Sequence, residues 1–227
     1  MARVVGASGE SPDFFVRYKV LALQRLGVQL GAGGAATILD FGGGVGQSSP
    51  HLRAVFPAAR VVCADVSMRS LRIGRQQFRE HADFVRFDGR VLPIADASVS
   101  IVFAACVFHH IPGEVHAHLF AEIARVLDAD GALVIFEHNP LNPLTRRVVD
   151  QCPFDADATL LRASRLRRSL DQHGFATRLD YHLFFPRFAR GLRPLEPHLS
   201  WLPAGAQYSI VARPSRSSTA AGLSERN

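Results

Sequence analysis

The chain has 227 residues, of which 48% are apolar, and a formal net charge of +6, so it can bury the core of one α/β domain with additions. Met1–Glu10 lacks an unbroken apolar core and no apolar run reaches the length of a membrane span, which argues against a signal peptide and a membrane partner. The three cysteines form no Cys-x-x-Cys pair, which argues against a disulfide framework and a metal site. Together these features favour a cytoplasmic enzyme. The positive charge is almost all arginine without interleaved aromatic residues, so we expect solvated arginines rather than a nucleic-acid surface, although some arginines could recognise an acidic substrate.

The first predicted element is an apolar helix within residues 13–30, which begins Asp13-Phe-Phe-Val-Arg-Tyr-Lys and precedes the first strand. Its aromatic side chains could simply pack on the sheet, or they could line a pocket. The sequence of the helix leaves both interpretations open.

An apolar strand then breaks into a glycine-rich loop. Residues 38–46 read Ile-Leu-Asp-Phe-Gly-Gly-Gly-Val-Gly. Glycine accepts positive φ and has no Cβ, so a ligand can approach the backbone here. A dinucleotide fingerprint, Gly-x-Gly-x-x-Gly/Ala, fails at Gln47 when it is read from Gly42, and the match at residues 31–36 precedes the strand instead of following it.

The pattern Asp-x-Gly-x-Gly-x-Gly, from Asp40 to Gly46, resembles the first motif of the class I S-adenosylmethionine-dependent methyltransferases. An acid at the strand end suits this cofactor, which carries a sulfonium and an ammonium but no phosphate. A glycine-rich turn without a ligand is the alternative. The resemblance implies cofactor contacts at Asp40, Phe41, Gly42, Gly43, Gly44 and Gly46.

The second strand, Arg60-Val-Val-Cys-Ala-Asp65, also ends in an acid. An acid at this tip can accept hydrogen bonds from both ribose hydroxyls of an adenosine-containing ligand. Asp65 could instead cap the helix predicted over residues 68–81, but Ser67 is the better N-cap. We therefore assign Asp65, together with the adjacent Val66, to cofactor binding.

The third strand, Asp83-Phe-Val-Arg-Phe-Asp88-Gly89, ends in Asp-Gly. The family resemblance implies that Asp88 bonds the adenine amino group and that Gly89 lies beside it, whereas an ordinary turn is the alternative. The acids that end these three strands should share one sheet edge, where ligands of open α/β sheets bind.

A fourth strand is predicted at Ser98–Ala105, followed by an amphipathic helix over 113–128 and a fifth strand at 132–137. The stretch Ile123–Ile135 is similar to the same region of many small-molecule methyltransferases, although Asp128-Ala-Asp-Gly131 replaces the usual Lys-Pro-Gly-Gly. The resemblance implies that the backbone at the end of the fourth strand surrounds the methionine part of the cofactor, at Ala104, Ala105 and Cys106.

Three histidines follow the ends of these two strands: His109 and His110 after the fourth, and His138 after the fifth. Methyl transfer to oxygen or nitrogen removes a proton from the acceptor, and histidine titrates near neutral pH. Each of the three is a candidate general base, with His109 and His138 ahead of His110. The alternative is that positioning alone supplies the acceleration.

Beyond the fifth strand we predict a short helix at 144–150, a helix within 157–173, and strands at Thr177–Phe185 and Ala206–Ala212. Residues 186–205 form an insertion between these strands, which we interpret as a lid or a partner surface. Residues 214–227 have the composition of a disordered tail. In the family, a helix before the first strand closes over the cofactor, so Phe14, Phe15, Tyr18 and Lys19 are candidates to line the pocket. For substrate binding we name Phe14 and Tyr18 of this helix and Trp201 of the insertion.

The sequence thus predicts one α/β domain over residues 1–213, with a cofactor-binding core at 36–137. Its fold class is a doubly wound, seven-stranded, mostly parallel, Rossmann-like sheet with an antiparallel last strand. The resemblance implies an enzyme that moves a methyl group from S-adenosylmethionine to an O, N or C atom of a small molecule and releases S-adenosylhomocysteine. A non-catalytic binding protein of the same fold and an NAD-dependent oxidoreductase are the alternatives.

Overall fold

The computed structural model describes residues 9–26, 36–152 and 158–215 of the chain. Its strands are β1 Thr37–Phe41, β2 Arg60–Asp65, β3 Asp83–Arg86, β4 Val99–Ala105, β5 Leu127–His138, β6 Phe175–His182 and β7 Gln207–Pro214. Its helices are α1 Pro12–Arg25, α2 Ser49–Val55, α3 Met68–Phe78, α4 Gly113–Val126, α5 Pro143–Asp150 and α6 Ala163–Gln172, with 3-10 helices η1 Phe108–His110 and η3 Arg187–Leu199.

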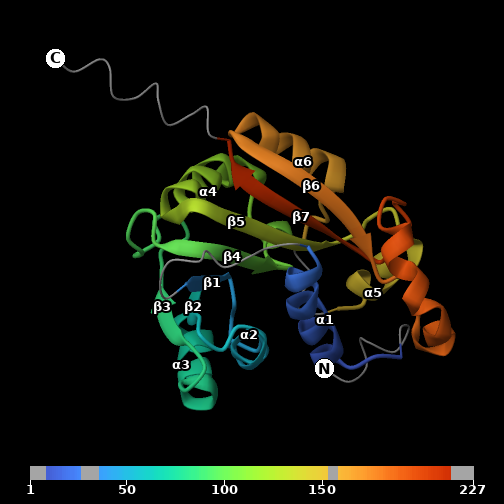
Figure 1. The fold of residues 1–227 in the computed structure, drawn as a ribbon, viewed down its shortest axis with the longest axis horizontal. Coiled ribbons are helices and arrows are strands. Elements are labelled where there is room, and N and C mark those ends of the chain that lie inside the picture. Colours follow the sequence, from blue (N-terminus) through green and yellow to red (C-terminus); the bar gives the residue numbers. More distant parts are fainter. Residues whose placement is uncertain (1–8, 27–35, 153–157, 216–227) are drawn as a thin grey trace.

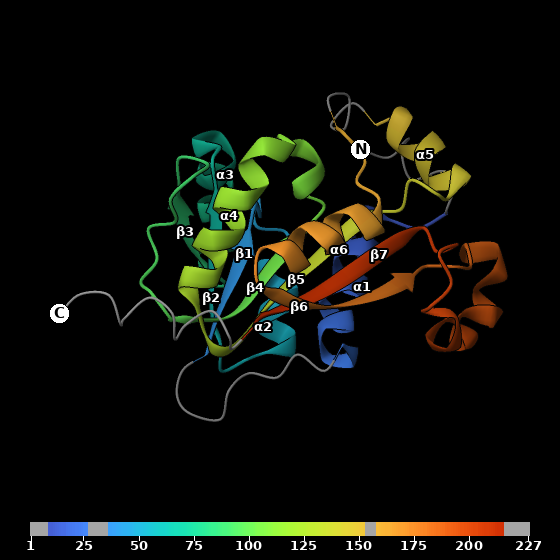
Figure 2. The ribbon, with the colours of Figure 1, turned by 90° about the horizontal axis from the view of Figure 1, so that it is seen from above.

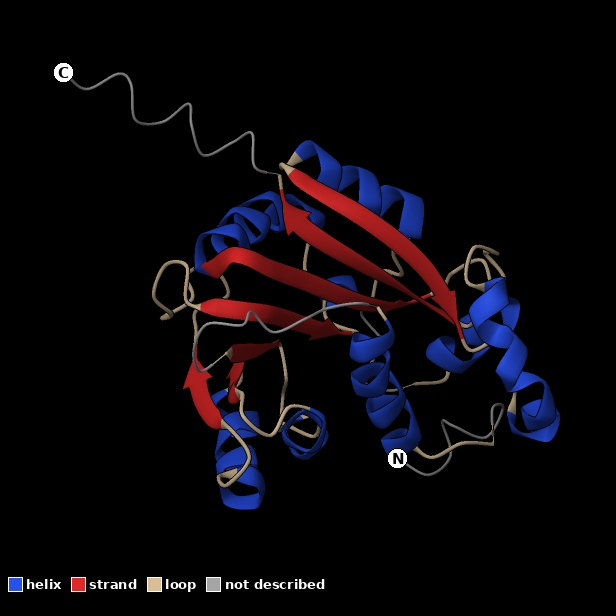
Figure 3. Ribbon diagram, viewed as in Figure 1, coloured by secondary structure: helices blue, strands red, loops and turns tan. Residues whose placement is uncertain are grey.

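The seven strands form one sheet in the order β3-β2-β1-β4-β5-β7-β6. The strands from β3 to β5 pair in parallel, and β7 runs antiparallel to both of its neighbours, β5 and β6 (Figure 3). This sheet confirms the predicted fold class, including the antiparallel last strand. The order of the strands reverses between β1 and β4, which is where open α/β sheets place their ligands.

Helices cover both faces of the sheet, as Figure 1 and Figure 2 show. The apolar side chains of α4 and α6 pack on one face, and those of α1, α2 and α3 pack on the other. Strand β4 is buried along almost its whole length because helices lie on both of its sides, as its apolar composition predicts. The result is a three-layer sandwich with the carboxyl ends of the parallel strands at one edge.

Several predicted boundaries were wrong by a few residues. The helix predicted over 113–128 ends at Val126, because β5 begins at Leu127 and pairs there with Val99. The expected turn at 128–131 is therefore part of a longer strand, with a register shift opposite it. Strand β6 ends at His182 and not at Phe185, since Leu183 has a φ of 61°.

Two predicted segments extend beyond the residues that the structure describes. Helix α1 ends at Arg25, and residues 27–30 of the predicted helix lie outside the described residues. The same holds for residues 216–227 of the predicted tail, whereas β7 extends to Pro214. Within residues 9–26, 36–152 and 158–215, no helix combines the length and apolar character that a membrane crossing requires.

Candidate active site

The glycine-rich loop connects β1 to α2 at the carboxyl edge of the sheet. Gly42 has a φ of 68°, and a Cβ there would come within 2.5 Å of Val107 Cγ1, so the close approach of the loop after β4 requires glycine. Gly44 has a φ of 59°, and a Cβ there would meet nothing within 4 Å. At Gly44, therefore, the backbone faces open space that a ligand can use.

Asp40 lies beneath this loop with a side chain that is almost fully buried, at 1% exposure. Burial, and then the charge of Asp65, raise the pKa of Asp40 to about 7, although a hydrogen bond from Ser48 opposes the shift. Its Oδ2 atom has no hydrogen-bond partner among the described residues. A buried carboxylate oxygen without a donor is energetically costly unless a cation or a donor arrives.

Asp65 joins the second strand to the glycine-rich loop. Its Oδ2 accepts a hydrogen bond of 2.8 Å from the backbone N–H of Gly44, and its Oδ1 accepts one of 2.7 Å from that of Ser67. Ser67 caps α3 by accepting from the Ser70 N–H at 3.2 Å. The prediction that Ser67, and not Asp65, is the N-cap is confirmed, and each Asp65 oxygen keeps a second lone pair for a ligand.

Asp88 and its neighbours lie more openly at the same edge. Asp88 Oδ1 accepts from the backbone N–H groups of Arg90 and Val91, both at 2.8 Å, and these bonds lower the pKa of the Asp88 carboxyl. The side chain of Val66 is 52% exposed, and a Cβ on Gly89 would lie 3.6 Å from it. The geometry leaves Asp88 ionised and accessible from solvent.

Cys106 directly follows β4 and lies in the left-handed region, with a φ of 59°, a conformation that is unfavourable for a residue with a side chain. The Nζ of Lys19 on α1 donates to its sulfur at 3.0 Å, and His138 is hydrogen-bonded to the same sulfur. Although burial opposes ionisation, the charges of Lys19 and His138 lower the pKa of Cys106 to about 6. Ala104 and Ala105, which precede it in β4, are buried and half-buried.

Glu137 organises the loop that carries the first two histidines. Its Oε1 accepts from the backbone N–H groups of Val107 at 3.1 Å and Phe108 at 2.8 Å, and its Oε2 lies 2.5 Å from His109 Nδ1. Both side chains are almost fully buried, at 0% for His109 and 1% for Glu137. A carboxylate that holds Nδ1–H fixes the tautomer in which Nε2 is the basic nitrogen.

The three histidines lie close together. The ring of His109 is centred 4.1 Å from that of His110 and 5.5 Å from that of His138. His110 is exposed and His109 is buried. Although burial opposes protonation of His138, the charge and hydrogen bond of Cys106 raise its pKa.

Sequence reasoning did not find the role of Glu137 or the contact of Lys19 with Cys106. Glu137 is the last residue of the predicted fifth strand, as acids end the predicted first three strands, and this is the signal that could have singled it out. Lys19 is the only lysine of the chain and is buried at 7% exposure, but its partner is 87 positions away.

The predicted substrate-binding residues separate into two groups. Phe14 and Tyr18 are neighbours on α1, with ring centroids 6.2 Å apart, and Tyr18 Oη lies 3.4 Å from His182 Nδ1. Trp201 follows η3, is 72% exposed and donates to the carbonyl of His198. The structure thus places Trp201 on the surface. Phe14 and Tyr18 instead lie on the side of the insertion that faces the sheet, and the guanidinium of Arg193 lies 4.9 Å from the centre of the Phe14 ring.

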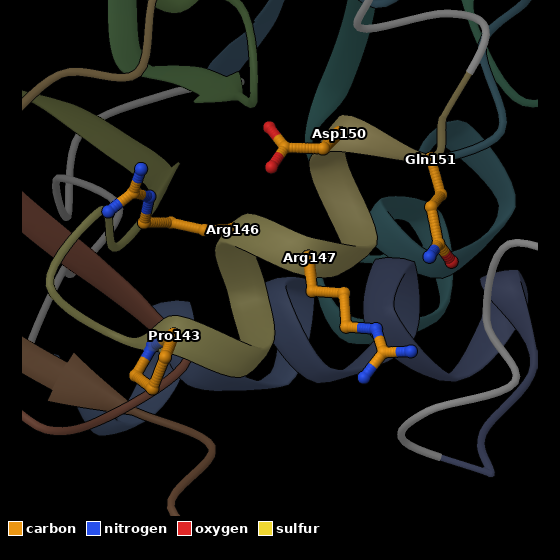
Figure 4. Close-up of a pocket in the computed structure, with 5 residues that line it drawn as sticks. All are labelled: Pro143, Arg146, Arg147, Asp150 and Gln151. Atoms are coloured by element: carbon orange, nitrogen blue, oxygen red, sulfur yellow. The ribbon is translucent and has the colours of Figure 1, made fainter.

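A cavity of about 380 Å³ lies along α5 and not at the glycine-rich loop (Figure 4). It is lined by Pro143, Arg146, Arg147, Asp150 and Gln151. The lining comes from α5 and the residue after it and is mostly charged, so this hollow is a polar surface feature separate from the strand ends.

Comparison with known proteins agrees with this geometry. A family model described as a methyltransferase domain matches residues 39–135. The chain is 30% identical over 146 residues to the ubiquinone/menaquinone biosynthesis C-methyltransferase UbiE of Hahella chejuensis, which covers 61% of this chain and 56% of the relative. It is 34% identical over 119 residues to the trans-aconitate 2-methyltransferase of Azoarcus sp., covering 52% of this chain and 46% of that protein.

The chain thus spans about half the length of the curated relatives it matches. Among solved structures, it superposes on an S-adenosylmethionine-dependent methyltransferase from Archaeoglobus fulgidus with a TM-score of 0.65. The match covers 87% of this chain and 93% of the other at 15% identity. At that identity the superposition shows a shared fold.

Proposed function

We propose that the chain is a class I S-adenosylmethionine-dependent methyltransferase, and that it transfers a methyl group to an oxygen, nitrogen or carbon atom of a small molecule. The match of residues 39–135 to a methyltransferase-domain model, the similarity to the two methyltransferases named above and the shared fold support this proposal. The two relatives named above are a C-methyltransferase and a trans-aconitate methyltransferase, so the proposal leaves the acceptor atom open. Cys63, Cys106 and Cys152 form no disulfide bond in the part of the chain that the structure describes. This fits a reducing compartment, and we include a cytoplasmic location in the proposal.

The observation that carries this proposal is the buried Asp40 oxygen without a donor, set beneath a loop whose backbone faces open space at Gly44. A ligand that brings an ammonium or a sulfonium would supply the missing positive charge, whereas a pyrophosphate would place negative charge near Asp40 and Asp65. The carboxylates of Asp40 and Asp65 therefore fit S-adenosylmethionine better than a dinucleotide. When it is bound, S-adenosylmethionine supplies an electrophilic methyl group.

In this proposal the chain holds the cofactor along the strand ends. Asp65 accepts from the ribose hydroxyls while it anchors Gly44, and Asp88 accepts from the adenine amino group. The backbone after β4, from Ala104 to Cys106, borders the methionine part. The left-handed conformation of Cys106 turns the chain at this point and leads into the histidine-bearing loop.

We propose His109 as the general base, ahead of His138 and His110. Glu137 holds His109 Nδ1 at 2.5 Å, so Nε2 is the atom that would take the acceptor's proton, and the carboxylate would stabilise the imidazolium that forms. His138 is engaged with Cys106, which fits it less well for accepting a proton from a substrate. An acceptor carbon whose C–H group has a low pKa would depend on this base less than an acceptor hydroxyl would.

We further propose that the acceptor enters between α1 and the insertion at residues 186–205. Phe14 and Tyr18 line the α1 side, and Arg193 of η3 reaches across to Phe14 and to the Glu10 carboxylate, at 2.8 Å. These contacts connect the insertion to α1, so movement of one is transmitted to the other. The surface position of Trp201 makes it a contact at the rim rather than in the depth of such a pocket.

The experiment is incubation of the purified protein with methyl-labelled S-adenosylmethionine and fractionated metabolites. Appearance of label in an acceptor fraction, with one equivalent of S-adenosylhomocysteine per label, is the expected result. Tight binding of the donor without label transfer to any fraction would instead favour a non-catalytic binding protein. Hydride exchange with NAD and no response to either sulfur compound would favour the oxidoreductase.

A further inference from the structure

The 3-10 helix η3 is oriented with its apolar side toward solvent. Phe188 lies before a kink at Ala189, and Leu192 and Leu195 lie one turn apart after it. Their side chains are 91%, 47% and 51% exposed. Glu196, the single acid among residues 187–199, is buried at 8% exposure. Figure 1 shows η3 as the orange segment at the right edge, at the opposite end of the molecule from α3.

Specific polar contacts fix this orientation. Glu196 Oε1 accepts from the backbone N–H groups of Phe184 and Phe185, both at 3.0 Å. Arg193 donates to the carbonyl of Phe185 at 3.2 Å and to Glu10. Turning the apolar side inward would move Glu196 outward, break these bonds and leave the backbone N–H groups of Phe184 and Phe185 without their acceptor. The exposed face is therefore built in, and Pro194 and Pro197 stiffen it.

The outward side of η3 is also basic. Arg187 and Arg190 are exposed near Phe188, and Arg187 also donates to the carbonyl of Gly9 at 3.1 Å. Trp201 follows the helix at 72% exposure. Because Glu196 points inward, η3 presents no carboxylate on this side. We define the η3 face as Arg187, Phe188, Arg190, Leu192, Leu195 and Trp201.

Helix α5 continues the same character at this end of the molecule. It carries exposed Leu144 and exposed Arg146 and Arg147. Its start is fixed beside the chain that follows η3, because Asn142 Nδ2 donates to the Ala204 carbonyl at 2.8 Å. The acid of α5, Asp150, lies at the far end of the helix.

The exposed apolar side chains and arginines of the η3 face together favour one kind of binding partner. A second copy related by a two-fold axis would bring the same arginines face to face, which is repulsive. Nucleic acid would match the arginines but leave the phenylalanine and leucines without apolar partners. A lipid surface with anionic headgroups matches both, because it offers negative charge at the level of the arginines and acyl chains below it.

We propose that the η3 face binds the surface of an anionic membrane, with Phe188, Leu192, Leu195 and Trp201 inserted at the headgroup boundary and Arg187 and Arg190 among the headgroups. This is peripheral and reversible attachment, so it departs from the expectation that the chain has no membrane partner. It does not depend on the proposed methyl transfer.

The test is flotation of the full chain with vesicles of phosphatidylglycerol and phosphatidylcholine, compared with vesicles of phosphatidylcholine alone. Binding to the anionic vesicles, weakened by added salt, is expected. Phe188→Ser and Arg190→Glu should each weaken it by about ten-fold. Both side chains are exposed, so neither change removes a core contact.

Matched controls come from α3 at the other end of the molecule. Ile73 is 36% exposed and Arg72 is also exposed, so Ile73→Ser and Arg72→Glu make the same kinds of change and should leave flotation unchanged. Failure of the parent chain to float, equal binding to both vesicle types, or equal losses in the α3 controls would overturn the proposal. So would light scattering that shows a dimer dispersed by Phe188→Ser.

Discussion

The carboxylate of Asp65 accepts a hydrogen bond of 2.8 Å from the backbone N–H of Gly44, 21 positions earlier in the chain. This bond ties the tip of β2 to the loop after β1. The residue proposed to hold the ribose therefore also sets the conformation of the loop proposed to hold the methionine part.

Asp65→Ala should weaken S-adenosylhomocysteine binding by about 1–3 kcal/mol, because buried ribose hydroxyls and the Gly44 N–H lose their acceptor. Calorimetry measures this loss. Asp83→Ala is the control, since Asp83 lies on the outer strand β3 and pairs with exposed Arg60. An unchanged affinity in Asp65→Ala would remove Asp65 from the site.

Asp40 should make the unliganded protein less stable as the pH rises. Burial raises its pKa to about 7 in the folded state, so its neutral form favours folding below the ordinary pKa of about 4, and this contribution is lost as the pH rises through about 7. Asp40→Asn stays neutral. The free energy of unfolding of Asp40→Asn minus that of the parent protein should therefore be larger at pH 8 than at pH 5 by about 2–3 kcal/mol.

Urea unfolding of both proteins at the two pH values measures this difference. The same variant should bind S-adenosylhomocysteine more weakly at pH 8, because the amide offers no charge to the ammonium. A stability difference that is the same at both pH values would mean that Asp40 is not protonated in the folded protein near neutrality.

Cys106 should react with iodoacetamide at lower pH than an ordinary thiol. The sulfur displaces iodide and gains the carbamidomethyl group, and only the thiolate does so. With a pKa of about 6, modification should be half-maximal near that pH. Lys19→Met should move the midpoint upward by about one pH unit or more, because it removes a positive charge 3.0 Å from the sulfur.

Mass spectrometry of the labelled peptide separates Cys106 from Cys63, whose buried thiol has a raised pKa and should label poorly. S-adenosylhomocysteine should slow the labelling of Cys106 if the cofactor borders β4. Labelling that begins only near pH 9 in the parent would show that the Lys19–Cys106 contact does not hold a thiolate.

His109→Ala should bind the cofactor normally while turnover falls by about 10²-fold or more, as expected for loss of a general base. Glu137→Gln keeps an acceptor for the Val107 and Phe108 N–H groups, but it weakens the support of His109 and should lower turnover with little effect on cofactor affinity. His138→Ala and His110→Ala, assayed alongside, identify the base. Near-normal turnover in all three alanine variants would mean that positioning alone drives the reaction.

Local patterns in the sequence were enough to predict the fold and three acids near the carboxyl ends of the first three strands. Asp40 is the second-to-last residue of β1, Asp65 ends β2, and Asp88 lies two residues beyond β3, which ends at Arg86 and not at the predicted Asp88. Parallel strands bring these carboxyl ends together. The pairing of Glu137 with His109 could not be read in this way, because it depends on β4 and β5 being neighbours and on the rotation of a 3-10 turn.

Tertiary contacts also overrode local periodicity elsewhere. Pairing with Val99 extends β5 back to Leu127, through residues whose pattern predicts the end of a helix and a turn. In η3, apolar residues at helical spacing ordinarily indicate a buried face. The hydrogen bonds of buried Glu196 instead orient the apolar side chains of η3 toward solvent. The local sequence pattern does not predict these bonds.

Calorimetry of the unmodified chain with S-adenosylhomocysteine and, separately, with NAD tests the methyl-donor site most directly. We expect micromolar binding of S-adenosylhomocysteine, lost or strongly weakened in Asp65→Ala, and no measurable heat from NAD. Tight binding of NAD without a response to S-adenosylhomocysteine would contradict the assignment of the glycine-rich loop and the strand-end acids to a methyl donor.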